Sequence, residues 1–174
     1  MPATYTLISS NTLTVAAATV TFSTIPATYT DLNIRCSVRN TTSGNTVSDF
    51  WVKFNGLTGS IYSRTRLQGN GAAGASDRTA STSIDNFENM MNGGSSTSNT
   101  FSNVDIYIPN YAGSTTKPHS MFGAMENNAT TAYIAVQANL IPGNTDAISS
   151  MIFTSGSDNF AIGSSFYLYG ISNA

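Results

Sequence analysis

The chain reads Asp31-Leu32-Asn33-Ile34-Arg35-Cys36-Ser37-Val38-Arg39-Asn40, and this stretch decides the fold class. Apolar residues occupy every second position from 32 to 38, with a polar residue between each pair. Successive side chains on a strand point to opposite faces, so a period of two predicts one buried and one solvated face. The alternation returns near residues 104–108, 134–137 and 166–169, where the apolar members are expected to face the core. The sequence therefore predicts an all-β chain.

Short strands separated by turn residues run along the whole chain. Turn signals such as Asn55-Gly56 and Pro142-Gly143-Asn144 separate them. We expect strands at 4–9, 19–23, 31–39, 48–54, 61–67, 82–87, 102–108, 120–125, 132–139, 149–154 and 165–171. Two polar stretches, 68–79 and 89–100, are predicted to be long surface loops.

Near-regular strand spacing is typical of a sandwich or a barrel. We expect one domain over residues 1–174, an antiparallel two-sheet β-sandwich of the jelly-roll kind. Residues 1–18 form either an extended N-terminal arm or an edge strand.

The composition is polar but almost uncharged. Charged residues are 9% of the chain, whereas Ser, Thr and Asn together exceed a third. Such a surface is solvated through hydrogen bonds and produces little electrostatic field, so we expect neither a nucleic-acid nor a membrane partner.

The few charges are divided unevenly along the chain. Residues 1–87 hold six basic and four acidic groups, a net charge of +2, and residues 88–174 hold one basic and five acidic groups, a net charge of −4. The division is either scatter in small numbers or a pair of complementary patches on neighbouring copies. The second interpretation makes interface candidates of four arginines: Arg35, Arg39, Arg64 and Arg66.

Reactive residue types are scarce. Cys36 lies on the apolar face of its strand and is expected to be a buried thiol. His119 is the single histidine, and the chain has no G-x-S-x-G nucleophile elbow. The letters of Gly69–Gly74 match the dinucleotide fingerprint, but no helix pattern follows them, so they predict a loop. The nine acidic residues are scattered singly, which does not favour a metal site. We expect no enzymatic activity, no metal and no cofactor.

Aromatic residues raise two further possibilities. Trp51 and Lys53 share the strand face opposite Phe50, and this face either stacks on sugars or is covered by the fold.

The last strand, residues 165–171, is apolar on both faces. Phe166 and Leu168 lie on one face, and Tyr167, Tyr169 and Ile171 lie on the other. One sandwich core accepts only one face, so we expect Tyr167, Tyr169 and Ile171 to pack against a neighbouring copy.

Four ordered segments carry a resemblance to a family. They are 22–32, 54–63, 108–115 and 160–171, including Ile108-Pro109-Asn110-Tyr111 and the ending Phe166-Tyr167-Leu168-Tyr169-Gly170-Ile171. From about residue 20 to 171 the chain resembles a set of β-rich virion proteins of tailed bacteriophages. The resemblance implies a non-enzymatic structural protein located in the phage particle and made in the host cytoplasm.

The resemblance leaves two positions in the virion open. The chain lacks the coiled-coil or repetitive shaft of a full fibre, which favours a compact capsid decoration (cement) protein on the outer head surface, bound to the major capsid protein. A homotrimer is expected from the resemblance alone. The alternative is a tail-associated or receptor-binding domain that contacts host glycans.

Overall fold

The computed structural model describes residues 4–141 and 144–172, and in these residues it contains two antiparallel sheets and no helix. The strands are β1 (Tyr5–Thr12), β2 (Thr19–Phe22), β3 (Asp31–Val38), β4 (Val47–Phe54), β5 (Tyr62–Gly69), β6 (Gly74–Thr82), β7 (Asp85–Asn92), β8 (Ser102–Ile108), β9 (Lys117–Met125), β10 (Tyr133–Ile141), β11 (Met151–Ser155) and β12 (Ser165–Ile171). The predicted all-β sandwich is confirmed.

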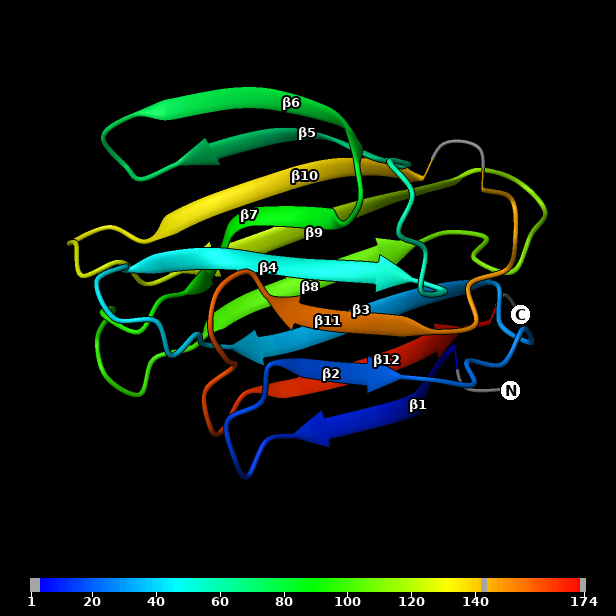
Figure 1. Cartoon of the computed structure of the whole chain (residues 1–174), viewed down its shortest axis with the longest axis horizontal. Helices are drawn as coiled ribbons and strands as arrows, with labels where there is room; N and C mark the ends of the chain where they lie inside the picture. The colour runs from blue at the N-terminus through cyan, green and yellow to red at the C-terminus, as the bar shows by residue number, and fades with distance from the viewer. Residues whose placement is uncertain (1–3, 142–143, 173–174) are drawn as a thin grey trace.

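The strand order is that of a jelly roll with two insertions. One sheet has the order β1-β12-β3-β8-β9-β10-β5-β6, and the other has the order β2-β11-β4-β7. Strands β1, β12, β3 and β8 face β2, β11, β4 and β7, as in an eight-stranded jelly roll. In the chain, the hairpin β5–β6 follows β4 and the hairpin β9–β10 follows β8. In the sheet, these four strands lie beyond β8 and widen the first sheet (Figure 1). We call the eight strands the jelly-roll core and the four inserted strands the extension.

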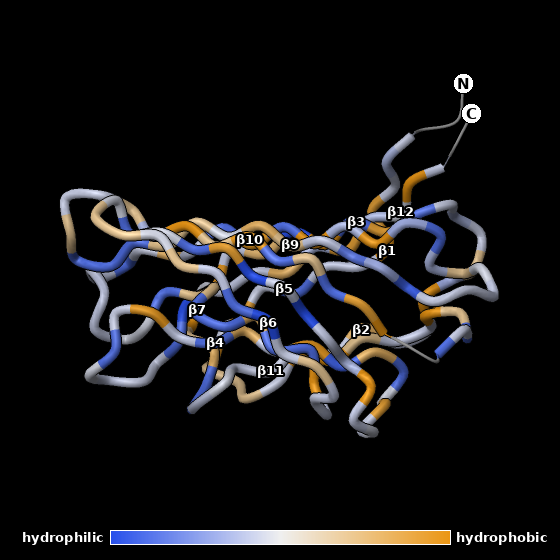
Figure 2. Tube along the Cα trace, turned by 90° about the horizontal axis from the view of Figure 1, so that it is seen from above, coloured by the Kyte–Doolittle hydropathy of each residue, from blue (hydrophilic) through white to orange (hydrophobic). Residues whose placement is uncertain are grey.

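The jelly-roll core buries the face that the sequence predicts. Leu32, Ile34 and Val38 of β3 have no exposed surface, and Cys36 is buried beside them. Figure 2 shows the two layers edge-on, and the residues of this core belong to the strands of both layers. Opposite β3, the ring of Phe50 packs 5.7 Å from Phe153 and 6.4 Å from Phe166, measured between centroids. Stacked aromatic rings of this kind fill the space between the sheets.

The predicted loop at 68–79 is wrong, because most of it forms the hairpin between β5 and β6. Gly69 pairs with Gly74, and β6 continues through Thr82 along the edge of the large sheet. The turn is closed by Asn70, whose Oδ1 accepts hydrogen bonds from the backbone N of Ala72 and Ala73. An edge strand with solvent on both sides has no need of apolar alternation, so its composition looked like that of a loop.

The predicted loop at 89–100 is partly wrong as well. Strand β7 extends to Asn92, and Met90 and Met91 are both fully buried in the core. Asn89 has a φ of 56°, and the pairing with β4 shifts register nearby, so both methionines reach the interior. The remaining turn, residues 93–100, is held by the guanidinium of Arg39, which donates to Gly94 O, Ser96 O, Thr97 O and Thr100 O, as well as to Ser96 Oγ.

The expected inward face of residues 134–137 is also wrong. In β10 the buried residues are Ala135, Gln137, Asn139 and Ile141, and the exposed ones are the apolar Ile134, Val136 and Leu140. The alternation predicted a strand correctly, but the side that faces the interior is the more polar one.

Candidate functional site

The outer face of the eight-stranded sheet carries an apolar area over β5, β10 and β9. The register places Leu67 beside Val136 and Val136 beside Phe122. These three side chains are 60%, 41% and 40% exposed. Ile134 and Leu140 lie on the same face of β10 and are 45% and 37% exposed. We call these five residues the apolar sheet face. Large apolar side chains gathered in this way on a surface are typical of an interaction site.

The row continues across the sheet with polar and aromatic groups. Phe122 is followed by Asp105, then Arg35, then Tyr167. Arg35 Nε lies 3.1 Å from Asp105 Oδ2, and Asn33 Nδ2 donates to the other oxygen of the same carboxylate at 2.8 Å. The two charges are therefore neutralised locally on the exposed face.

The inner face of β5 and β10 carries polar side chains where it meets the edge of β7. Arg64 Nη1 donates to Asn86 O at 2.8 Å, and Arg66 Nη1 donates to Glu88 O at 3.2 Å. Gln137 Nε2 also donates to Asn86 O, at 3.3 Å. A free strand edge presents unpaired carbonyls, and here long side chains from the large sheet satisfy them.

Two carboxylates complete this polar layer. Arg64 pairs with Glu88, and Arg66 pairs with Asp77 and, at 3.3 Å, with Glu88. The side chains of Arg64 and Arg66 are only 9% and 5% exposed. They share one strand face as expected, but that face is the inner one, and their charges are matched within the chain. Both guanidinium groups are thus turned away from a partner, although the interface role itself stays a prediction.

The other predicted interface residues divide between surface and interior. Arg35 and Tyr167 are exposed on the outer sheet face, and Tyr169 is half-buried there against Tyr5 at a ring distance of 6.3 Å. Arg39 and Ile171 are each only 9% exposed. The structure therefore brings Arg35, Tyr167 and Tyr169 together on one surface, whereas Arg39 and Ile171 are almost fully buried.

A buried pair of His119 and Asp85 lies between the sheets. His119 Nε2 hydrogen-bonds to Asp85 Oδ2, and Asn139 Nδ2 donates to Asp85 Oδ1. The side chains of the pair are 0% and 1% exposed, and the rings of Phe54 and Phe87 pack on the imidazole. Both side chains are enclosed, and their hydrogen bond links β7 to β9.

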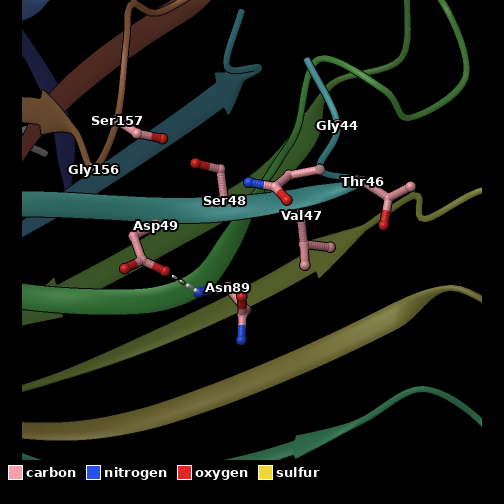
Figure 3. Close-up of a pocket in the computed structure, with 9 residues that line it drawn as sticks. Gly44, Thr46, Val47, Ser48, Asp49, Asn89, Gly156 and Ser157 are labelled. Carbon is pink, nitrogen blue, oxygen red and sulfur yellow. Dashed lines mark hydrogen bonds between the residues drawn. The ribbon is translucent and has the colours of Figure 1, made fainter. Parts of the chain in front are cut away.

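A polar cleft of about 460 Å³ lies at the start of β4 (Figure 3). Its walls include Asn45, Ser48, Asp49, Asn89 and Ser157, drawn from β4 and the loop before it, from β7 and from the segment after β11. Asp49 Oδ1 accepts a hydrogen bond from the backbone N of Asn89 at 2.9 Å. Amide, hydroxyl and carboxylate groups around an open hollow match the hydroxyls of a sugar.

Trp51 lies next to this cleft on the outer face of β4. A Cβ at Gly156, which lines the cleft, would lie 3.2 Å from the Trp51 ring, so the indole packs on the cleft wall. Trp51 and Lys53 are half-buried, so the fold covers this face in part, and its stacking on sugars stays a prediction. Trp51 Nε1 has no hydrogen-bond partner among the described residues.

The cysteine and metal predictions concern the interior. Cys36 is a buried free thiol, and burial, followed by the charge of Asp105, raises its pKa far above the ordinary range. Within residues 4–141 and 144–172, no three His, Cys, Asp or Glu side chains come together as a metal site would need.

The described part of the chain also contains no helix of the length and apolarity needed to cross a membrane.

The segments that carry the family resemblance converge at one end of the sandwich. The hydroxyl of Tyr111 donates to Pro26 O, and Asn110 N donates to Asp31 Oδ1 at 2.8 Å. The ring of Tyr29 lies so close to Gly170 that a Cβ there would be 2.3 Å from it. Three of the four segments therefore interlock, and the residues concerned build the fold rather than a ligand site.

Comparisons with protein-family models, with curated proteins and with solved structures find no match to this chain.

Sequence reasoning missed the apolar sheet face. Its signal was present in β10, where Ile134, Val136 and Leu140 alternate with Gln137 and Asn139. The alternation separates two faces, but only the covering of one face by β7 decides which of them is inside.

Proposed function

We propose that this chain is a structural protein of a tailed-phage virion, and specifically a capsid decoration protein that binds the assembled head shell. One observation carries the proposal: a wide sheet face with exposed apolar residues in a chain with only 9% charged residues. Such a face suits a protein that functions by being packed into an assembly. The resemblance of segments 22–32, 54–63, 108–115 and 160–171 to phage virion proteins supports the same role.

The proposed mechanism is mechanical. A protein that binds the assembled shell of the major capsid protein, and not its separated subunits, stabilises the shell by mass action. A polar and weakly charged exterior suits the outer head surface, because it has little attraction for the packaged DNA.

A second candidate is a tail-associated or receptor-binding domain that contacts host glycans. The polar cleft around Asp49, with the Trp51 ring against its wall, favours this alternative. Sugar sites combine hydrogen-bonding side chains with an aromatic surface in this way.

Copy number per particle distinguishes the two candidates. In purified virions, gel densitometry against the major capsid protein is expected to give hundreds of copies for a decoration protein. About a dozen copies would contradict the decoration role and support the tail appendage. Absence of the chain from virions would overturn both.

A further inference from the structure

Strands β5 and β10 of the extension are inverted relative to an ordinary half-solvated sheet. Their interior face holds Arg64, Arg66, Gln137 and Asn139 beside the buried Tyr62, Ala135 and Ile141. Their exterior face holds Leu67, Ile134, Val136 and Leu140 of the apolar sheet face, which Phe122 of β9 completes. A strand that alternates strictly normally turns its apolar side toward a covered surface. The exterior side of the extension is therefore built to be covered.

We propose that this surface is covered by a second copy of the same chain, packed sheet face to sheet face. The inference deepens the proposed virion role, on which its biological setting rests. The contact itself belongs to the chain and is measured on the purified protein.

The size of the face suits a contact between two proteins. Eight strands about 4.8 Å apart form a sheet about 34 Å wide, and strands of this length make it about 24 Å long. The whole outer face, of which the extension is half, is thus roughly 800 Å², close to the area that each partner contributes to a stable interface of standard size. The contact with a second copy therefore also includes β8, β3 and β12, where Asp105, Arg35 and Tyr167 continue the row. A sheet packs on a second sheet at a separation of about 10 Å with interdigitating side chains.

The charges of the face permit pairing with itself. Arg35 and Asp105 neutralise each other at 3.1 Å, and Asp31 accepts a hydrogen bond from the Tyr107 hydroxyl at 2.7 Å. The register places Asp31 and Arg78 on the same outer face as these groups, so two basic and two acidic residues give it no net charge. Two copies of this face therefore do not repel each other overall. A face that binds a strongly charged partner would instead carry a net charge opposite in sign to that of the partner.

The face also has hollows that can receive side chains. One of about 610 Å³ is lined by Thr65, Arg78 and Leu140, and another of about 280 Å³ is lined by Tyr107 and Pro118. Ala138 lines both hollows. An isologous contact brings one patch onto the same patch of a second copy. Exposed side chains such as Leu67 and Phe122 of one copy can then enter the hollows of the other.

The test measures the mass of the purified protein in solution by sedimentation, with variants on and off the face. The wild-type chain is expected to associate, and Phe122→Lys combined with Val136→Lys is expected to give a monomer with unchanged circular dichroism. The matched control is Val15→Lys combined with Ile162→Lys, at residues that are 67% and 62% exposed but lie outside the strands of the large sheet. The control should associate like the wild type.

A milder variant protects the test against misfolding. Leu67→Gln keeps the volume and adds no charge, and it should raise the dissociation constant about tenfold through lost apolar contact. A wild-type chain that is monomeric at every concentration overturns the proposal, as does an oligomer that survives unchanged in both face variants. A monomer found in hundreds of copies on virions would overturn this inference while leaving the decoration role intact.

Discussion

The jelly-roll core and strands β5 and β10 of the extension use the same alternation of polar and apolar residues in opposite directions. In the core, β3 places Leu32, Ile34 and Val38 between the sheets and Arg35 outside. In the extension, β5 places Arg66 inside and Leu67 outside. The difference teaches that the neighbour of a sheet face, rather than the pattern alone, selects the buried side.

The neighbours of the two regions differ in chemistry. The inner face of the core meets the apolar face of a second sheet, centred on Phe50 and Phe153. The inner face of the extension instead meets the edge of β7, where the carbonyls of Asn86 and Glu88 need donors. A hydrogen-bonding group buried without a partner costs about 1–3 kcal/mol, so polar side chains are favoured there.

The largest expected effect compares one substitution in the two regions. Ile34→Asp buries an unpaired carboxylate at a position with no exposed surface and should cost several kcal/mol, so that the chain does not fold. Ile134→Asp, at a position that is 45% exposed, should change the free energy of unfolding by less than about 1 kcal/mol. Circular dichroism and urea unfolding in dilute solution measure both. Equal losses would mean that the inside and outside of β10 are assigned the wrong way round.

A second comparison replaces an arginine by methionine in each region. Arg66→Met leaves Glu88 O without its donor and Asp77 without its ion pair, and should cost about 1–3 kcal/mol. Arg35→Met removes an exposed pair whose arginine side chain is 65% accessible, and should cost no more than about 0.5 kcal/mol. Urea midpoints give both values. If Arg66→Met proved neutral or stabilising, the covering of the β7 edge by side chains would contribute nothing to stability.

The last expected effect appears only above neutral pH and concerns the thiol in the core. Because burial raises the pKa of Cys36, the folded chain keeps its proton at a pH where the unfolded chain loses it. This contribution to stability is fully present below the unfolded thiol pKa of about 8.5 and falls above it by up to about 1.4 kcal/mol per pH unit.

The Cys36→Ala variant isolates this term. It should be less stable than the wild type at neutral pH because it leaves a small cavity, but it should lose less stability between about pH 8 and pH 10. Urea unfolding across that range measures the two slopes. Parallel slopes would show that Cys36 is not the group that titrates.

Much of the fold was predictable from local pattern. The alternation of residues 31–39 located β3 within one residue and identified its buried side, and the strand at 102–108 was predicted with the bounds that β8 has. The prediction failed at β6, where an exposed edge strand carries no alternation, and at β7, where the bulge near Asn89 interrupts it. Local sequence has no signal for the distant strand to which such segments pair.

Local residue pattern was enough to predict that the chain is all-β, that one face of each alternating strand differs from the other, and that the thiol of Cys36 lies with the apolar residues of β3. These properties follow from the period of two and from side-chain polarity, and both are local. The inward turn of Arg64 and Arg66 to the edge of β7, and the outward turn of Val136 and Phe122, follow instead from the packing of the two sheets. Which side chains face inward in the extension depends on the strand edge that lies over it, which is the edge of β7. Strand β7 is held there by its pairing with β4, and β4 is far from β9 and β10 in the chain.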